Sequence, residues 1–124
     1  MLKIAVFVSG GGTDLQSVID AIEANQINGK IVLVISNRKN AYGLERAKKA
    51  GIETAVVKKD DELIVKMLKE REVDLVVLAG YLAILSDVLI DAYPNKIINI
   101  HPSLIPSFCG PGYYGMHVHE AVLK

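Results

Sequence analysis

The sequence predicts an α/β fold: an open, doubly wound and mostly parallel sheet, covered by helices on both faces in three α/β/α layers. Five short segments are apolar at nearly every residue, as expected of strands that are buried on both faces. Stretches with helical periodicity alternate with these segments, and right-handed crossovers between parallel strands then produce a doubly wound sheet. The chain has 124 residues, of which 51% are apolar and 23% are charged, and this suits one globular domain.

The strands are predicted from the apolar runs themselves. The first run is rich in β-branched residues and the third alternates only weakly, whereas the others are almost continuously apolar. Strands are expected at residues 4–8, 31–35, 52–57, 75–79 and 97–100. A glycine-rich turn at residues 9–14 follows the first strand.

The helices are predicted from apolar residues that recur three or four positions apart. They are expected to include residues 15–22, 43–50, 63–68 and 89–93. Gly51 suits the C-terminal end of the second helix, and Asp60 or Asp61 can cap the start of the third. Ser86 is expected to cap the fourth helix, which ends at Pro94.

The last part of the chain has a different composition. Residues 102–115 contain three prolines and three glycines, which predicts a long ordered loop of the kind that is usually functional. The following residues are interpreted as a helix, and the sequence stops inside it at Lys124. We therefore expect a single domain over residues 1–124 that is incomplete at its C-terminus.

Charge and cysteine content exclude several classes of protein. Fourteen basic and fourteen acidic residues cancel, whereas binding to nucleic-acid phosphates usually needs a basic excess. The apolar runs are far shorter than the roughly 20 residues that span a bilayer. The single Cys109 suggests a reducing compartment, and Cys109, His117 and His119 lack the paired spacing of metal ligands. We expect a cytoplasmic protein with no nucleic-acid partner, no membrane partner and no metal.

Three segments that directly follow predicted strands form the candidate site. Ligands of open parallel sheets bind at the carboxyl ends of the strands, so these segments should face one cleft. They are residues 9–14, 80–86 and 99–107.

The first segment favours an anion. It opens a helix, and the unpaired N–H groups at a helix N-terminus attract negative charge. Three consecutive glycines followed by Thr13 favour phosphate binding, with a tight turn that needs glycine for geometry alone as the alternative. Leu15 replaces the third glycine of the dinucleotide fingerprint, and Arg38 after the second strand gives only weak support for NADP.

The other two segments suggest chemistry and an apolar wall. Asn99 and His101 are two residues apart at a strand end, so their side chains point to the same face. An imidazole beside a carboxamide can transfer protons and stabilise an oxyanion, although a histidine that only satisfies backbone groups is the alternative. Residues 80–85 are apolar and either join the core or wall a pocket for a flat ring.

Together the segments resemble the phosphoribosylglycinamide formyltransferase family, the folate-dependent enzymes of purine biosynthesis. The resemblance covers essentially the whole chain, in the order of the family. It rests on residues 9–16, 36–37, 43–47, 78–86 and 99–106. The motif Asn-x-His-Pro-Ser-Leu-x-Pro is shared by wider formyltransferase relatives, whereas the glycine-rich start followed by Leu-Gln is typical of the glycinamide ribonucleotide enzymes.

The resemblance implies a Rossmann-like formyltransferase fold and a reaction. A formyl group would pass from 10-formyltetrahydrofolate, as co-substrate, to the amine of glycinamide ribonucleotide. The backbone of three residues would hold the ribonucleotide phosphate: Gly12, Thr13 and Asp14. Four residues would line the pterin ring of the folate: Leu82, Ala83, Ile84 and Leu85.

Asn99 and His101 match the catalytic residues of the family. The resemblance implies that both stabilise the tetrahedral oxyanion formed when the amine attacks the formyl carbon, and that Asn99 also contacts the cofactor. A proton is then relayed to the departing folate nitrogen.

Three departures from the family pattern qualify the resemblance. Asp14 stands where many relatives have Asn, and Ala83 stands where some have Arg. The family's catalytic aspartate lies further along than Lys124, so we expect the 124-residue chain alone to be close to inactive. The alternatives are a methionyl-tRNA formyltransferase or formyltetrahydrofolate deformylase type of enzyme, and a non-catalytic phosphate-binding module; a homodimer also stays open.

Overall fold

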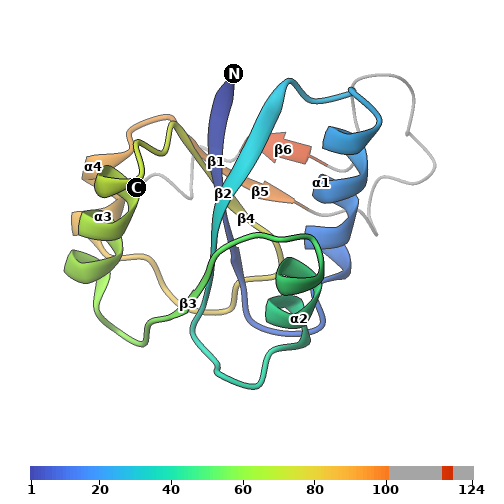
Figure 1. The fold of residues 1–124 in the computed structure, drawn as a ribbon. Helices are drawn as coiled ribbons and strands as arrows, with labels where there is room; N and C mark the ends of the chain where they lie inside the picture. Colours follow the sequence, from blue (N-terminus) through green and yellow to red (C-terminus); the bar gives the residue numbers. More distant parts are fainter. Residues whose placement is uncertain (101–115, 119–124) are drawn as a thin grey trace.

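The computed structural model describes residues 1–100 and the backbone of a short strand at residues 116–118. Six strands form one sheet: β1 (Leu2–Val8), β2 (Gly29–Ser36), β3 (Thr54–Val56), β4 (Leu75–Leu78), β5 (Ile97–Ile100) and β6 (Met116–Val118). Their spatial order is β3-β2-β1-β4-β5-β6 (Figure 1). The first five strands are parallel and β6 is antiparallel, which confirms the mostly parallel sheet.

Within residues 1–100, four helices cover the two faces of this sheet: α1 (Thr13–Glu23), α2 (Tyr42–Lys49), α3 (Asp61–Glu70) and α4 (Asp87–Ala92). Figure 1 shows α1 and α2 on one side and α3 and α4 on the other. The side chains of β1 alternate between the two cores, because successive strand residues point to opposite faces. Ala5 and Phe7 pack under α3 and α4, whereas Ile4, Val6 and Val8 pack under α1 and α2. The three-layer α/β/α architecture is therefore confirmed.

The helix ends show which predicted caps form. The Leu63 N–H donates to Asp60 Oδ1 at 3.1 Å, so Asp60 rather than Asp61 caps α3. After α2, Gly51 has φ 75° and its N–H donates to the Lys48 carbonyl at 3.0 Å. This left-handed turn is the predicted use of glycine after a helix.

Ser86 is the N-cap residue of α4, as predicted, but it makes no side-chain cap hydrogen bond. Its backbone N–H instead donates to Asp61 Oδ2 at 2.8 Å. The contact with the start of α3 orients this turn in place of a local cap.

Strand β6 corrects the helix that was expected around His117. Its three residues pair with β5, and His117 lies opposite Asn99. The free edge of β5 offers unpaired backbone groups, and pairing with this edge outweighs local periodicity in so short a segment. The predicted loop at residues 102–115, His101 and residues 119–124 lie outside the described part of the chain.

Candidate functional site

The strand order places a topological switch point between β1 and β4. The chain moves outward from β1 through β2 to β3, and then returns to the other side of β1 as β4. The loops that follow β1 and β4 therefore leave the sheet side by side at its carboxyl edge, where ligands of such sheets bind.

Ser9 ties three of the loops at this edge together. It follows β1 directly and is only 1% exposed. Its hydroxyl donates to Asn37 Oδ1 at 2.6 Å, beyond β2, and accepts from the Leu82 N–H at 2.8 Å, beyond β4. The sequence placed residues 9–14 and 80–86 at one edge, whereas the hydrogen bonds through Ser9 and the contribution of Asn37 after β2 were not predicted.

The glycine loop, residues 10–12, packs closely against the start of α2. Gly12 has φ 80°, and a Cβ added there would lie 2.5 Å from Gly43 Cα. The Gly43 N–H donates to the Gly10 carbonyl at 2.9 Å, and Arg46 Nε donates to the Gly11 carbonyl at 2.8 Å. Two glycines facing each other thus allow the loop and helix to touch through their backbones.

Helix α1 starts directly at this loop. Gly12 precedes the helix, and its carbonyl accepts the first helical hydrogen bond from the Gln16 N–H at 2.8 Å. A glycine has no side-chain oxygen, so it cannot cap the N–H groups of the first turn. A helix start of this kind can accept an anion, as was predicted for Gly12, Thr13 and Asp14.

Asp14 lies next to the loop that follows β4. A Cβ added at Gly80 would lie 3.8 Å from Asp14 Oδ2, in ordinary van der Waals contact. The start of α1 and the loop after β4 are therefore neighbours across the switch point.

The segment from Tyr81 to Leu85 alternates between half-buried and exposed side chains. Tyr81 packs edge-on against Phe7 at 5.2 Å between ring centroids, and burial raises the pKa of Tyr81, with Asp61 adding to the effect. Leu82 and Ile84 are 76% and 94% exposed, whereas Ala83 and Leu85 are half-buried. Two large apolar side chains thus project from a loop at the ligand edge of the sheet.

A pocket of about 380 Å³ opens between this segment and the start of α3. Ile84 and Val88 form its apolar side, and Asp60, Asp61 and Glu62 form its acidic side. The exposed part of the loop after β4 therefore borders a cavity rather than a flat surface.

Asn99 lies at the same edge. It is half-buried near the end of β5, and it pairs in register with Leu78, the last residue of β4. The described structure therefore brings the glycine loop, the loop after β4 and Asn99 to one edge of the sheet. His101, the second predicted catalytic residue, lies outside the described residues.

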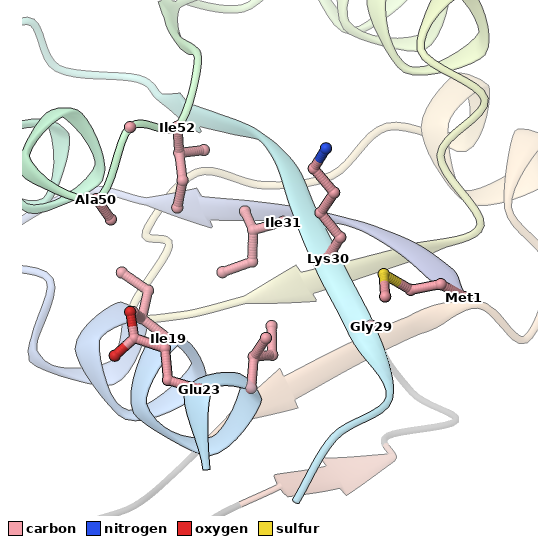
Figure 2. A pocket seen from close by; sticks show the side chains of 10 residues that line it. Met1, Ile19, Glu23, Gly29, Lys30, Ile31, Ala50 and Ile52 are labelled. Atoms are coloured by element: carbon pink, nitrogen blue, oxygen red, sulfur yellow. The ribbon is translucent and has the colours of Figure 1, made fainter. Parts of the chain in front are cut away.

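A second pocket of about 380 Å³ lies at the opposite, amino-terminal edge of the sheet. Figure 2 shows Ile19, Ile31 and Ile52 extending into it from α1, β2 and the segment before β3. Sequence reasoning did not predict this pocket, because its apolar lining has the same pattern as core residues. It contains none of the predicted site residues.

No group of three or more His, Cys, Asp or Glu side chains within residues 1–100 is placed to hold a metal ion. No helix in that part of the chain has the length and apolar character needed to cross a membrane.

Comparison with known proteins assigns the family. A family model described as formyl transferase matches residues 2–124. The chain is 47% identical over 122 positions to phosphoribosylglycinamide formyltransferase of Haemophilus influenzae, covering 92% of this chain and 58% of that protein. It is 41% identical over 131 positions to the chloroplastic phosphoribosylglycinamide formyltransferase of Arabidopsis thaliana, covering 98% of this chain and 45% of that protein.

A solved structure agrees with these relatives. Glycinamide ribonucleotide transformylase 1 from Symbiobacterium toebii superposes with a TM-score of 0.78 at 41% identity, covering 89% of this chain and 56% of that one. The chain thus spans about half the length of the relatives it matches. The matched family, the level of identity and the shared sheet lead to one conclusion: the chain belongs to the formyl transferase family.

Proposed function

We propose that the protein transfers a formyl group from 10-formyltetrahydrofolate to the amine of glycinamide ribonucleotide, a step of purine biosynthesis. One observation carries the proposal: Ser9, which lies between β1 and the glycine loop, accepts a hydrogen bond from the Leu82 N–H in the loop after β4, at the switch point of the sheet. A site for a phosphorylated substrate and a site for a flat apolar ring are thereby adjacent. The relatives named phosphoribosylglycinamide formyltransferase support the same acceptor and the transfer of a formyl group.

The backbone of Gly12, Thr13 and Asp14 would hold the ribonucleotide phosphate. Helix α1 starts here without a side-chain cap, and the positive end of its dipole favours an anion. Because the donors are backbone N–H groups, the carboxylate of Asp14 can be directed toward Gly80 instead of the phosphate.

The pterin ring would lie against the segment formed by Leu82, Ala83, Ile84 and Leu85. The exposure of Leu82 and Ile84 supports this role, because ligand pockets combine apolar walls with a few polar groups. The nearby backbone supplies N–H and C=O groups for the polar edge of the ring.

Asn99 and His101 would act on the formyl carbon. The substrate amine attacks this carbon, and the carbonyl oxygen becomes a tetrahedral oxyanion. The Asn99 carboxamide and a protonated His101 donate hydrogen bonds to that oxygen. When the intermediate collapses, the bond to the folate nitrogen breaks and the nitrogen receives a proton.

A carboxylate beyond residue 124, which the resemblance implies, would orient His101 and favour its protonated imidazole. Without this carboxylate, formyl transfer should be close to zero. Loss of the orienting aspartate in a serine-protease triad costs about 10⁴-fold in rate. Phosphate binding uses none of that region and should persist.

Two measurements test the proposal. The 124-residue chain is titrated with glycinamide ribonucleotide, and formyl transfer is assayed beside a version extended through the family's aspartate. We expect binding by both proteins and turnover only by the longer one. Comparable turnover by both would refute the need for the downstream carboxylate, and absence of ribonucleotide binding by both would refute the phosphate site.

A further inference from the structure

Helix α2 donates hydrogen bonds to two carbonyl groups of the glycine loop. The Gly10 carbonyl accepts from the Gly43 N–H, and the Gly11 carbonyl accepts from Arg46 Nε at 2.8 Å. The described peptide bonds are all trans, so the C=O of one residue and the N–H of the next point in opposite directions. An Arg46 that fixes the Gly11 carbonyl therefore also directs the Gly12 N–H away from α2.

The guanidinium of Arg46 is itself held in place. Its Nη1 donates to Gln16 Oε1 on α1 at 3.4 Å, and its carbon lies 5.1 Å from the centroid of the Tyr42 ring. A Cβ at Gly12 would lie 3.1 Å from Arg46 Cδ, so the stem of the side chain also packs beside the loop. Arg46 thus contacts the glycine loop, α1 and its own helix.

We propose that Arg46 is a positioning residue of the phosphate site. It turns the Gly11 carbonyl, which would repel an anion, toward α2, and so leaves the Gly12 N–H directed to the ligand side of the loop. This inference rests on the proposed function, because it concerns the same phosphate. Arg46 touches the loop rather than the ligand, and its planar donor fork explains why it can serve Gly11 and Gln16 together.

The test compares phosphorylated and unphosphorylated ligand. Dissociation constants are measured for glycinamide ribonucleotide and for its ribonucleoside with the full chain and the Arg46→Gln, Arg46→Lys and Lys48→Gln variants. Lys48→Gln is the matched control, because it removes one positive charge from the same exposed helix without touching the loop. Thermal unfolding and the amide chemical shift of Gly12 report on folding and on the loop directly.

We expect Arg46→Gln to weaken ribonucleotide binding roughly 10- to 100-fold, the size of a lost charge-assisted hydrogen bond, and to leave ribonucleoside binding unchanged. Arg46→Lys should lose less, since an ammonium group can still reach one of the two partners. The Gly12 amide signal should move in both Arg46 variants and stay in place in Lys48→Gln.

Two results would overturn the inference, in distinguishable ways. An Arg46→Gln variant that keeps the ribonucleotide preference, or a Lys48→Gln variant that loses it equally, removes the positioning role alone. An unmodified chain that binds ribonucleotide and ribonucleoside equally removes the phosphate site, and with it both the proposed function and this inference. If Arg46→Gln does not fold, Arg46→Lys decides by the same comparison.

Discussion

The Gly12→Ala variant is predicted to destabilise the protein, because glycine at this position is required twice. Its φ of 80° lies in the left-handed region, which an L side chain rarely adopts. Its missing side chain also makes room for α2, since a Cβ would lie 2.5 Å from Gly43 Cα. The neighbouring atom belongs to the backbone, so no rotation of a side chain relieves the contact.

The cost follows from these two terms. An alanine in the left-handed conformation costs roughly 1–2 kcal/mol. Displacing backbone that is already packed adds about 1–3 kcal/mol. We therefore expect Gly12→Ala to lose about 2–5 kcal/mol of the free energy of unfolding, well above an ordinary surface substitution.

Urea unfolding followed by circular dichroism measures this loss, and Gly11→Ala serves as its control. A Cβ at Gly11 would meet nothing within 4 Å, and its φ is not in the left-handed region. The control should unfold within about 0.5 kcal/mol of the unmodified chain. Equal destabilisation by both variants, or none by Gly12→Ala, would refute the argument from the Gly43 contact.

Three further predictions concern the edge of the sheet and the surface. Ser9→Ala leaves the Leu82 N–H without its acceptor, so it should lower the free energy of unfolding by about 1–3 kcal/mol and weaken folate binding. The control Ser17→Ala, at an exposed serine, should change neither quantity, and calorimetry with both variants measures them. Ile84→Ser should leave the unfolding midpoint unchanged, because the side chain is 94% exposed, yet weaken folate binding by about 1–2 kcal/mol; an unchanged folate affinity would contradict the apolar wall. The hydrogen bond from Arg71 lowers the pKa of Glu53, so this pair stabilises the fold fully at pH values above 4.5, the ordinary pKa of Glu, and the stabilisation is lost as pH falls through the lowered pKa. In urea titrations, the stability difference between the unmodified chain and Glu53→Gln should be at most about 1 kcal/mol at pH 7 and should shrink steadily as the pH is lowered below 4.5.

The central strands were predicted well from the sequence because each one is an unbroken run of apolar residues. Val6, Leu33 and Val77 belong to runs that are fully buried, so no competing local pattern exists. Strand β6 could not be predicted in this way. Its three residues pair with β5, which is distant in the sequence, and such a pairing leaves no periodic pattern in the residues of β6 themselves.

In the candidate site, too, the features with a local sequence signal were predicted and the long-range contacts were not. The glycine loop and the loop after β4 were predicted from their positions after strands, which is a local signal. The contacts that join them were not predicted, because they connect distant residues: Ser9 to Leu82 across 73 positions and Arg46 to Gly11 across 35. No local sequence pattern marks either contact, so only the folded geometry identifies these two residues.

The three consecutive glycines now offer a test between the two interpretations of the loop, a tight turn or a phosphate site. Packing requires glycine at Gly12 alone, because a Cβ at Gly10 or Gly11 would lie in open space and neither has a positive φ. If the loop were only a turn, alanine at Gly10 and Gly11 would be neutral in every assay. If a phosphate approaches the backbone closely, a methyl group in that open space obstructs it. We therefore expect Gly11→Ala to keep its unfolding midpoint while its dissociation constant for glycinamide ribonucleotide rises several-fold, with Gly10→Ala as the neighbouring comparison. Unchanged binding in both variants would show that the ligand does not use this open space, and would favour the turn.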